Sequence, residues 1–269
     1  MAKRIALDKR ILAAVKSPAV EPRIPWRRIE TRVRLLRAAY EVMSIKGVDA
    51  ATIREITDCA HVGFGTFFNY FKSKDEVAAR LLDCIINDLA RRNDLATMPF
   101  KVSEPSRVMP VSVRLTLREA SRDPVWRWWA MRPDLLADRM RRGFAPFGTR
   151  DMRLAIKAGF YALDEKDVET TWAIMVWMMV GALCDIVAGD YPAKHEKYVV
   201  EMITRVAGAS SEAARMLVAN PLPHYPPAKV DFTFELSQPE LAVHNTPGKL
   251  SRDFLQTDKG ALVGGKLDG

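Results

Sequence analysis

The sequence predicts an all-α protein with a small N-terminal helical domain and a larger helical bundle after it. Three observations predict this fold class. Two helix-capping signatures lie close together between residues 52 and 76, apolar residues recur every three to four positions along most of the chain, and no strand-like alternation of any length appears before residue 230. Such spacing places apolar side chains on one face of each helix, where they can share a core.

Residues 52–71, TIREITDCAHVGFGTFFNYF, predict two short helices joined by a tight turn. Thr52 is a suitable N-cap, and Glu55 three residues later completes a capping box. The His-Val-Gly sequence at 61–63 interrupts the apolar spacing, and a second helix is expected over residues 64–71. A helix, a short turn and a second helix are typical of the helix-turn-helix that reads the DNA major groove, although an ordinary helical hairpin has the same spacing.

Helices are also expected on both sides of this pair. Upstream, residues 29–46 carry one apolar stripe, and Gly47 is a suitable C-terminal stop. Downstream, Ser73 and Glu76 form a second capping box that opens a helix. The sequence therefore predicts three helices around one small core, followed by a longer fourth helix.

The block of residues 52–77 resembles the N-terminal DNA-binding domain of TetR-type (tetracycline-repressor-like) transcriptional regulators. The matches run in register across helix, turn, helix and cap: Thr52, Ala60, Val62, Gly65, Thr66, Tyr70, Phe71, Lys72, Ser73, Lys74, Asp75 and Glu76. The resemblance covers about residues 27–92 well and the rest of the chain loosely. The DNA-contacting residues expected from it and from the local charge are Arg27, Arg28, Thr52, Arg54, Gly63, Phe64, Gly65, Thr66, Phe68, Asn69, Tyr70, Lys72 and Lys74.

Four positions depart from the family pattern. His61 stands where the family usually has Gly, at a turn position that tends to need a positive φ, which His tolerates at some cost. Phe68 replaces the usual Tyr, so a hydroxyl that commonly meets a phosphate is missing. Gly63 and Phe64 stand where polar residues are usual. We therefore expect the operator to be read more through DNA shape and apolar contact with thymine methyl groups.

Positive charge is concentrated at the N-terminus. Residues 1–37 contain eleven Lys or Arg against three acidic residues, a net charge of +8 that equals the formal charge of the whole chain. A cationic segment beside a helix-turn-helix is the electrostatic signature of a duplex-binding protein. We expect phosphate contacts from Arg27, Arg28 and Arg32, and a flexible basic arm over residues 1–24, for which a solvated tail without a partner is the alternative.

The second domain, residues 74–223 after the 25–73 DNA-binding domain, is expected to be a helical bundle. Its helices are predicted over residues 108–121, from Pro133 through Met140, over 149–158, from about 166 to 188 with Asp164 as cap, and over 194–206 and 212–219. Because three Trp within residues 126–129 cannot share one helix face, at least one is expected at the surface or at an interface. Residues 224–269 form a Pro/Gly-rich tail, in which 229–236 are a lone strand or a docked extended segment and the last twenty or so residues are disordered.

Residues 170–184 form a run of fifteen without a charge. A membrane span needs about eighteen or more, so no membrane partner is expected. A helix that is apolar on all sides must be buried on all sides, and a second copy of the chain can cover one of them. A purely intramolecular core helix is the alternative. The family resemblance implies a two-fold dimer through the last two helices, with the interface expected at Met175, Met178, Met179, Ala182, Tyr198, Met202 and Val206.

An effector pocket is expected in the second domain, lined by aromatic and sulfur-containing side chains that also suit a plain core. The candidates are Trp126, Trp129, Met131, Phe144, Phe147, Phe160, Trp172 and Trp177. No cofactor, metal site or enzymatic activity is expected, because the four His are dispersed and the sequence lacks G-x-S-x-G, P-loop and G-x-G-x-x-G motifs. The three Cys are predicted to be buried reduced thiols.

These features together predict a cytoplasmic, nucleoid-associated transcriptional regulator that acts as a repressor. We expect it to bind a palindromic operator on double-stranded DNA as a homodimer. The family resemblance implies that a small apolar or aromatic effector of unknown identity releases it, by a shift of the helix over residues 74–92. The alternative is a helical interaction protein of the same fold that has lost sequence-specific DNA binding.

Overall fold

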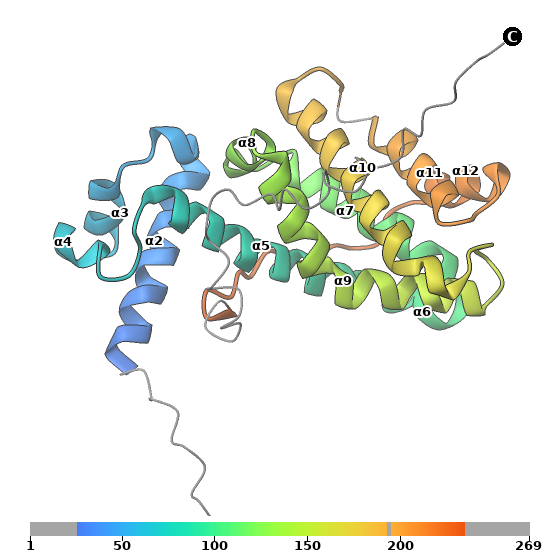
Figure 1. Ribbon diagram of the computed structural model, residues 1–269, viewed down its shortest axis with the longest axis horizontal. Helices are drawn as coiled ribbons and strands as arrows, with labels where there is room; N and C mark the ends of the chain where they lie inside the picture. Colours follow the sequence, from blue (N-terminus) through green and yellow to red (C-terminus); the bar gives the residue numbers. More distant parts are fainter. Residues whose placement is uncertain (1–25, 193–194, 235–269) are drawn as a thin grey trace, which may run out of the picture.

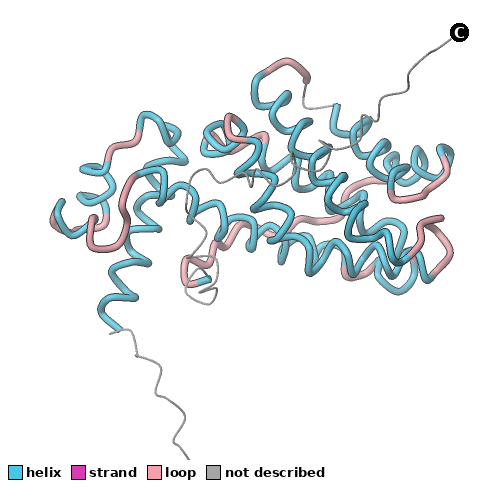
Figure 2. The backbone as a smooth tube through the Cα atoms, in the orientation of Figure 1, coloured by secondary structure: helices cyan, strands magenta, loops and turns pink. Residues whose placement is uncertain are grey.

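The computed structural model describes residues 26–192 and 195–234. Within these ranges the chain forms helices and loops without a strand (Figure 2), as the fold-class prediction states. The expected basic arm over residues 1–24 and the expected disordered end of the tail lie outside the described residues.

A small N-terminal head is built from α2 (Trp26–Ala50), α3 (Ile53–Cys59) and α4 (Phe64–Phe67). The long helix α5 (Lys74–Thr97) leaves the head and runs into the larger helical bundle (Figure 1). Gly47 has φ 79°, outside the helical range, so the regular part of α2 ends at the stop that the sequence indicates. Ile56, Phe67 and Phe71 are fully buried and form much of the head core.

Both capping predictions identify helix starts, and the first is confirmed in full. Thr52 Oγ1 accepts a hydrogen bond from the N–H of Glu55 at 3.2 Å, and the Glu55 carboxylate accepts from the N–H of Thr52 at 2.9 Å. Ser73 Oγ likewise accepts from the N–H of Glu76 at 3.1 Å. The Glu76 carboxylate, however, accepts from the N–H of Lys72 at 2.7 Å, so the second box is only half formed.

The helix predicted over residues 64–71 is shorter in the structure. α4 ends at Phe67, and residues 68–70 continue as a turn in which the N–H of Asn69 donates to the carbonyl of Thr66 and the N–H of Tyr70 to that of Phe67. This tightening from four-residue to three-residue hydrogen bonds is a common way to end a helix. It carries the chain back so that Phe71, 1% exposed, enters the head core beside Phe67.

The bundle contains α7 (Val108–Ala120), α8 (Val125–Ala130), α9 (Pro133–Lys157), α10 (Val168–Ala188), α11 (Glu196–Val206) and α12 (Ser211–Ala219). Short helical pieces precede α7 and α10, namely α6 (Phe100–Ser103), η1 (Pro105–Arg107) and η2 (Glu165–Asp167). α10 packs along α9, and α11 lies against α7 and α12 (Figure 1). Asp164 does not cap α10 as predicted, because η2 intervenes; its carboxylate pairs with Lys166 at 3.2 Å.

α9 is one continuous helix where the sequence predicts two. Gly143 and Gly148, which lie between the two predicted helices, are positions of close helix packing. A Cβ on Gly143 would lie 2.3 Å from Cγ2 of Ile86 in α5, and a Cβ on Gly148 would lie 2.4 Å from the ring of Trp172 in α10. Pro146 is tolerated within the helix on its exposed side. Glycine here serves the approach of neighbouring helices rather than chain reversal.

All three tryptophans of α8 are buried, so none reaches the surface, and the interface alternative of the prediction applies, because α8 lies between the head and the bundle. Trp126, Trp128 and Trp129 are 2%, 3% and 0% exposed, because α8 is packed by α2 of the head and by α9 and α10 of the bundle. The indole N–H of Trp129 donates to the carbonyl of Ala78 in α5 at 3.1 Å. This tryptophan cluster therefore forms the joint between head and bundle.

α10 is the most apolar helix of the described chain. By length and composition alone, residues 165–188 are apolar enough to cross a membrane, a property that the core helices of soluble proteins share. Contacts with α7, α8, α9 and α11 bury Val168, Met175 and Leu183 within the bundle. Its apolarity thus has an explanation inside the fold, while Ile174 and Trp177 leave one face uncovered, at 50% and 54% exposure.

The cysteines are free thiols, but they are not all buried as predicted. Cys84 is buried in the core, Cys184 is partly buried, and Cys59 is exposed on α3, where its thiol donates to the Glu41 carboxylate at 3.4 Å. After α12 the chain returns along the bundle in an irregular segment, residues 221–234, which we call the C-terminal strap. Its alternating residues dock Phe232 into the core rather than form a strand, which confirms the second of the two sequence alternatives for its described part.

Candidate DNA interface and ligand cavity

Most of the residues expected to contact DNA are exposed on the head. Ten of the thirteen are exposed: Arg27, Arg28, Thr52, Arg54, Gly63, Phe64, Gly65, Phe68, Asn69 and Lys72. Thr66, Tyr70 and Lys74 are partly buried. The turn before α4 has the expected geometry, since His61 has φ 53°, the one positive φ of a non-Gly residue among those described.

Two aromatic rings stand out on α4 and the turn that follows it. Phe64 and Phe68 are 47% and 51% exposed, and their rings meet edge to face at 5.6 Å. The Arg54 guanidinium lies 5.6 Å from the Phe64 ring centre. An exposed apolar pair flanked by a cation suits the thymine methyl groups and phosphates of a major groove.

Two cations predicted to contact DNA or phosphate also hold the head together. Lys74 Nζ donates to the carbonyls of Asp49 at 2.8 Å and Ala51 at 2.9 Å. Arg32 Nη1 donates to the carbonyl of Tyr70 at 2.7 Å, and its guanidinium lies 4.2 Å from the ring centre of Phe71. The structural part of both roles could not be read from the sequence, because the acceptors are backbone carbonyls 23 to 38 residues away.

A cavity lies in the bundle between α5, α7, α9 and α10. The space open to water-sized molecules is about 40 Å³. Its apolar wall comes from Met109, Val113, Phe144, Phe147, Trp172 and Met179, and its polar wall from Asn93, Asp94, Ser112, Thr116 and Asp151. A compact cavity with an aromatic wall and a few convergent polar groups is typical of a small-molecule site.

The polar wall is internally hydrogen-bonded. The Asn93 amide donates to Thr116 Oγ1 at 2.9 Å and to the carbonyl of Ser112 at 3.2 Å. Burial opposes ionisation of Asp94, but ion pairs with Lys101 and with Arg150 at 2.5 Å outweigh it and hold the pKa of Asp94 below its ordinary value. Burial raises the pKa of Asp151 despite its own pair with Arg150. The cavity therefore combines aromatic surface with hydrogen-bonding groups and two acidic side chains.

Three of the eight predicted pocket residues line this cavity, namely Phe144, Phe147 and Trp172. Trp126 and Trp129 are instead fully buried in the tryptophan joint, while Met131, Phe160 and Trp177 are 76%, 50% and 54% exposed on the surface. Sequence reasoning missed the polar wall. The available signal was Ser112 and Thr116, one turn apart on an otherwise apolar helix face, with Asn93 on the preceding long helix.

The residues predicted for the dimer interface divide into two groups. Met175 and Met179 are buried inside the bundle, at 0% and 2% exposure. Met178, Ala182, Tyr198 and Met202 line an open groove between α10 and α11. Val206 is 39% exposed. Beside these lie two apolar side chains that were not predicted there, Ile174 and Trp177, at 50% and 54% exposure.

Among residues 26–192 and 195–234, no group of three His, Cys, Asp or Glu side chains could hold a metal ion. A helix-turn-helix head joined by one long helix to a helical bundle with a cavity defines this protein as a DNA-binding regulator. Residues 35–81 match the bacterial regulatory proteins of the tetR family, and residues 104–220 match the tetracyclin repressor-like C-terminal domain. The chain belongs to the TetR family of transcriptional regulators.

Solved structures share this fold. The crystal structure of RolR in complex with the ligand resorcinol is 23% identical, with a TM-score of 0.68, and covers 76% of this chain and 100% of its own. The structure of RolR without ligand is 22% identical, with a TM-score of 0.64, and covers 72% of this chain and 99% of its own. No curated protein matches this chain in sequence.

Proposed function

We propose that this protein is a ligand-responsive repressor that binds a palindromic operator as a homodimer and leaves it when a compact aromatic effector enters the bundle cavity. The observation that carries the proposal is the course of α5. Lys74, its first residue, is hydrogen-bonded to the head, while Asn93 and Asp94 near its other end line the cavity. One helix thus touches both the DNA-binding head and the effector site.

On the DNA side, we infer that Phe64 and Phe68 lie against thymine methyl groups and that Thr66, Asn69 and Tyr70 contribute polar contacts. Both rings are exposed on α4 and the turn after it, which supports this inference, because the second helix of a helix-turn-helix lies in the major groove. Phosphate contacts position the head on DNA without reading the base sequence. We infer that they come from the exposed residues Arg27, Arg28, Thr52, Arg54 and Lys72.

The apolar face of α10 and α11 is proposed to pair with the same face of a second copy. Ile174, Trp177 and Tyr198 are each at least 50% exposed. Tyr198 lines the groove with Met178 and Met202, and Ile174 and Trp177 belong to α10, one of its two helices. An apolar surface of this kind is costly to leave in water, and the TetR family is dimeric. A two-fold pair places two recognition helices about one helical turn of DNA apart, which matches a palindrome.

The effector is proposed to be a one-ring aromatic compound that carries hydroxyl groups. Phe144, Phe147 and Trp172 offer ring contacts, and Thr116 and Asp151 offer hydrogen-bond partners. At about 40 Å³ the cavity must widen to admit even one ring, and a long or multi-ring compound would require a larger rearrangement of its walls. RolR, which shares the fold, is solved with resorcinol, a ligand of this chemistry. Such a compound shifts the protein away from DNA only through a higher affinity for the released state.

Binding to defined DNA tests the proposal. Full-length protein is mixed with random duplexes, bound sequences are recovered over several rounds, and affinity for the best one is measured against salt. We expect a palindromic site, a stoichiometry of two chains, and a steep salt dependence whose slope falls by about 0.9 for each phosphate that Arg27→Ala or Arg28→Ala leaves without its cation. Flat or absent binding at low salt would instead support an interaction protein that has kept only the fold.

A further inference from the structure

The C-terminal strap, residues 221–234, provides a second physical connection between the cavity and the head. Figure 1 shows this segment, coloured orange to red, running from α12 back along the bundle and ending near α5 on the side of the head. It follows residue 220, where the match to the family's C-terminal domain ends. Its contacts fall into three places along its length.

At the cavity, Tyr225 completes the hydrogen bonding of Asn93. The Tyr225 hydroxyl donates to Asn93 Oδ1 at 2.9 Å, while both amide hydrogens of Asn93 are donated to Ser112 and Thr116. Asn93 is 5% exposed, so water does not substitute freely for any of these partners. Asn93, Ser112 and Thr116 all line the cavity. The strap thus fixes the orientation of a side chain in the cavity wall.

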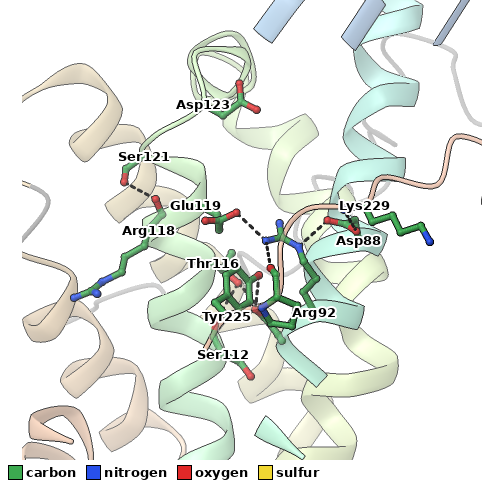
Figure 3. A network of polar contacts seen from close by, with 12 residues as sticks. Asp88, Arg92, Ser112, Thr116, Arg118, Glu119, Ser121, Asp123, Tyr225 and Lys229 are labelled. Carbon is green, nitrogen blue, oxygen red and sulfur yellow. Dashed lines mark hydrogen bonds and ion pairs between the residues drawn. The ribbon is translucent and has the colours of Figure 1, made fainter. Parts of the chain in front are cut away.

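In the middle, α5 holds the strap through a buried ion pair (Figure 3). Arg92 Nε donates to the Asp88 carboxylate at 2.7 Å, and Arg92 Nη1 donates to the carbonyl of Pro226 at 3.3 Å. The Arg92 guanidinium lies 4.5 Å from the Tyr225 ring centre. The second Asp88 oxygen accepts from the N–H of Lys229 at 3.2 Å. These contacts involve the Arg92 guanidinium and both oxygens of the Asp88 carboxylate. They fix the position of the strap along α5.

At its far end the strap contacts the head. Phe232 is 8% exposed and packs with its ring centre 5.9 Å from that of Tyr40 in α2. The Tyr40 hydroxyl donates to the Asp123 carboxylate at 3.4 Å, just before α8. The far end of the strap therefore packs at the junction where α2 of the head meets the bundle.

From these contacts we infer that the C-terminal strap couples the cavity to the head, with Tyr225 as the positioning residue for Asn93. A hydroxyl-bearing ligand that bonds Thr116 or Asn93 must compete with the existing hydrogen bonds of Asn93. Displacing Tyr225 loosens the strap on Arg92 and Asp88, which shifts Phe232 against Tyr40 and changes the support of α2. The inference rests on the proposed function for its ligand, and by linkage the head must influence the cavity to the same degree.

Amide hydrogen exchange on the full chain, without DNA or ligand, tests this connection. The variants are Tyr225→Phe, which removes only the hydroxyl, Phe232→Ala, and the control Thr233→Ala, an exposed strap residue bonded only to Asp231. We expect Tyr225→Phe to speed exchange in residues 36–43 of α2, and Phe232→Ala to speed exchange in residues 109–117 of α7, each by about five-fold, the order of one hydrogen bond. The control should change neither.

Faster exchange confined to the helix that each substituted residue touches would overturn the inference. A second measurement addresses function, with resorcinol as the probe. The ratio of DNA dissociation constants with and without resorcinol should fall at least about three-fold in Tyr225→Phe relative to the unsubstituted protein, since the hydrogen bond that this variant removes is part of the coupling. If the unsubstituted protein binds no DNA, the proposed function fails. The exchange result still decides whether the strap couples the cavity to the head.

Discussion

Lys74 Nζ lies 2.9 Å from the carbonyl oxygen of Ala51 and 2.8 Å from that of Asp49, so the first residue of α5 holds the end of α2. The sequence predicts Lys74 as a DNA-contacting residue. The structure gives it a second role, because three ammonium hydrogens can satisfy carbonyls that the helix end leaves open. The two roles make different predictions.

We expect Lys74→Ala to lower the free energy of unfolding by about 1–2 kcal/mol, through the loss of charged hydrogen bonds, and to weaken DNA binding as well. Lys72→Ala is the matched control, since it removes the same charge two residues earlier from an exposed side chain. Urea unfolding and DNA titration of both variants separate the roles. Equal stability of the two variants would show that the hydrogen bonds from Lys74 to the α2 carbonyls contribute nothing.

The capping box at the start of α3 should give Glu55 an unusually low pKa. Hydrogen bonds from Lys46 and then from Thr52 lower the pKa of Glu55 from 4.5 to about 2. Because the folded pKa lies below the ordinary value, the stabilisation is complete above about pH 4.5 and is lost as the pH falls through about 2. An NMR titration of the Glu55 carboxyl should show this midpoint, and Lys46→Met should raise it. A midpoint that Lys46→Met leaves in place would contradict the assigned cause.

Gly148→Ala should disturb the cavity through Trp172. The added methyl would lie 2.4 Å from the indole ring, so the ring must move or α9 and α10 must separate. We expect a loss of about 1–3 kcal/mol in the free energy of unfolding, typical of overpacking, together with loss of any effector response. Gly65→Ala is the stability control, because its added methyl meets nothing within 4 Å. Thermal unfolding of both variants measures the difference. An unchanged stability of Gly148→Ala would show that the Trp172 ring can move aside without cost.

Thymine methyl groups should contribute to operator affinity through Phe64 and Phe68. Replacing operator thymines with deoxyuridine removes only the methyl group, and at a contacted position this should weaken binding by about four-fold, the order of one buried methyl. In Phe68→Ala the same replacement should cause a smaller loss of affinity than in the unsubstituted protein. A double-mutant cycle measured by fluorescence anisotropy gives this difference. Additive losses from the protein and DNA changes would place the ring away from the methyl group.

A charge on the uncovered face of α10 should dissociate the dimer. We expect Trp177→Glu to weaken dimerisation by at least about 30-fold, as for an aromatic residue central to an interface. Phe160→Glu is the control, because Phe160 is similarly exposed, at 50% against 54%, but lies between α9 and η2 and not on α10 or α11. Sedimentation velocity over a concentration series measures both variants. A monomer in the unsubstituted protein, or dissociation in both variants, would contradict the proposed interface.

Some features of this protein follow from the sequence because they depend on neighbours in the chain. The capping box at Thr52, the stop at Gly47 and the left-handed turn at His61 are set by hydrogen bonds and sterics within a few residues, and the structure has all three. The family follows for the same reason, since its motif is a short local block. The continuity of α9 did not follow, and neither did the close packing at Gly143 and Gly148, because their neighbours Ile86 and Trp172 are distant in the chain.

By itself, then, the sequence determined the all-helical class, the head and its outward-facing residues. Only the tertiary structure decided which aromatic residues form the cavity, because Trp126 and Phe144 have the same local character and differ only in which helices surround them. It also decided the double role of Lys74 and the path of the strap from Tyr225 to Phe232. These depend on contacts between residues up to 192 positions apart in the chain, such as Tyr40 and Phe232, which no local pattern encodes.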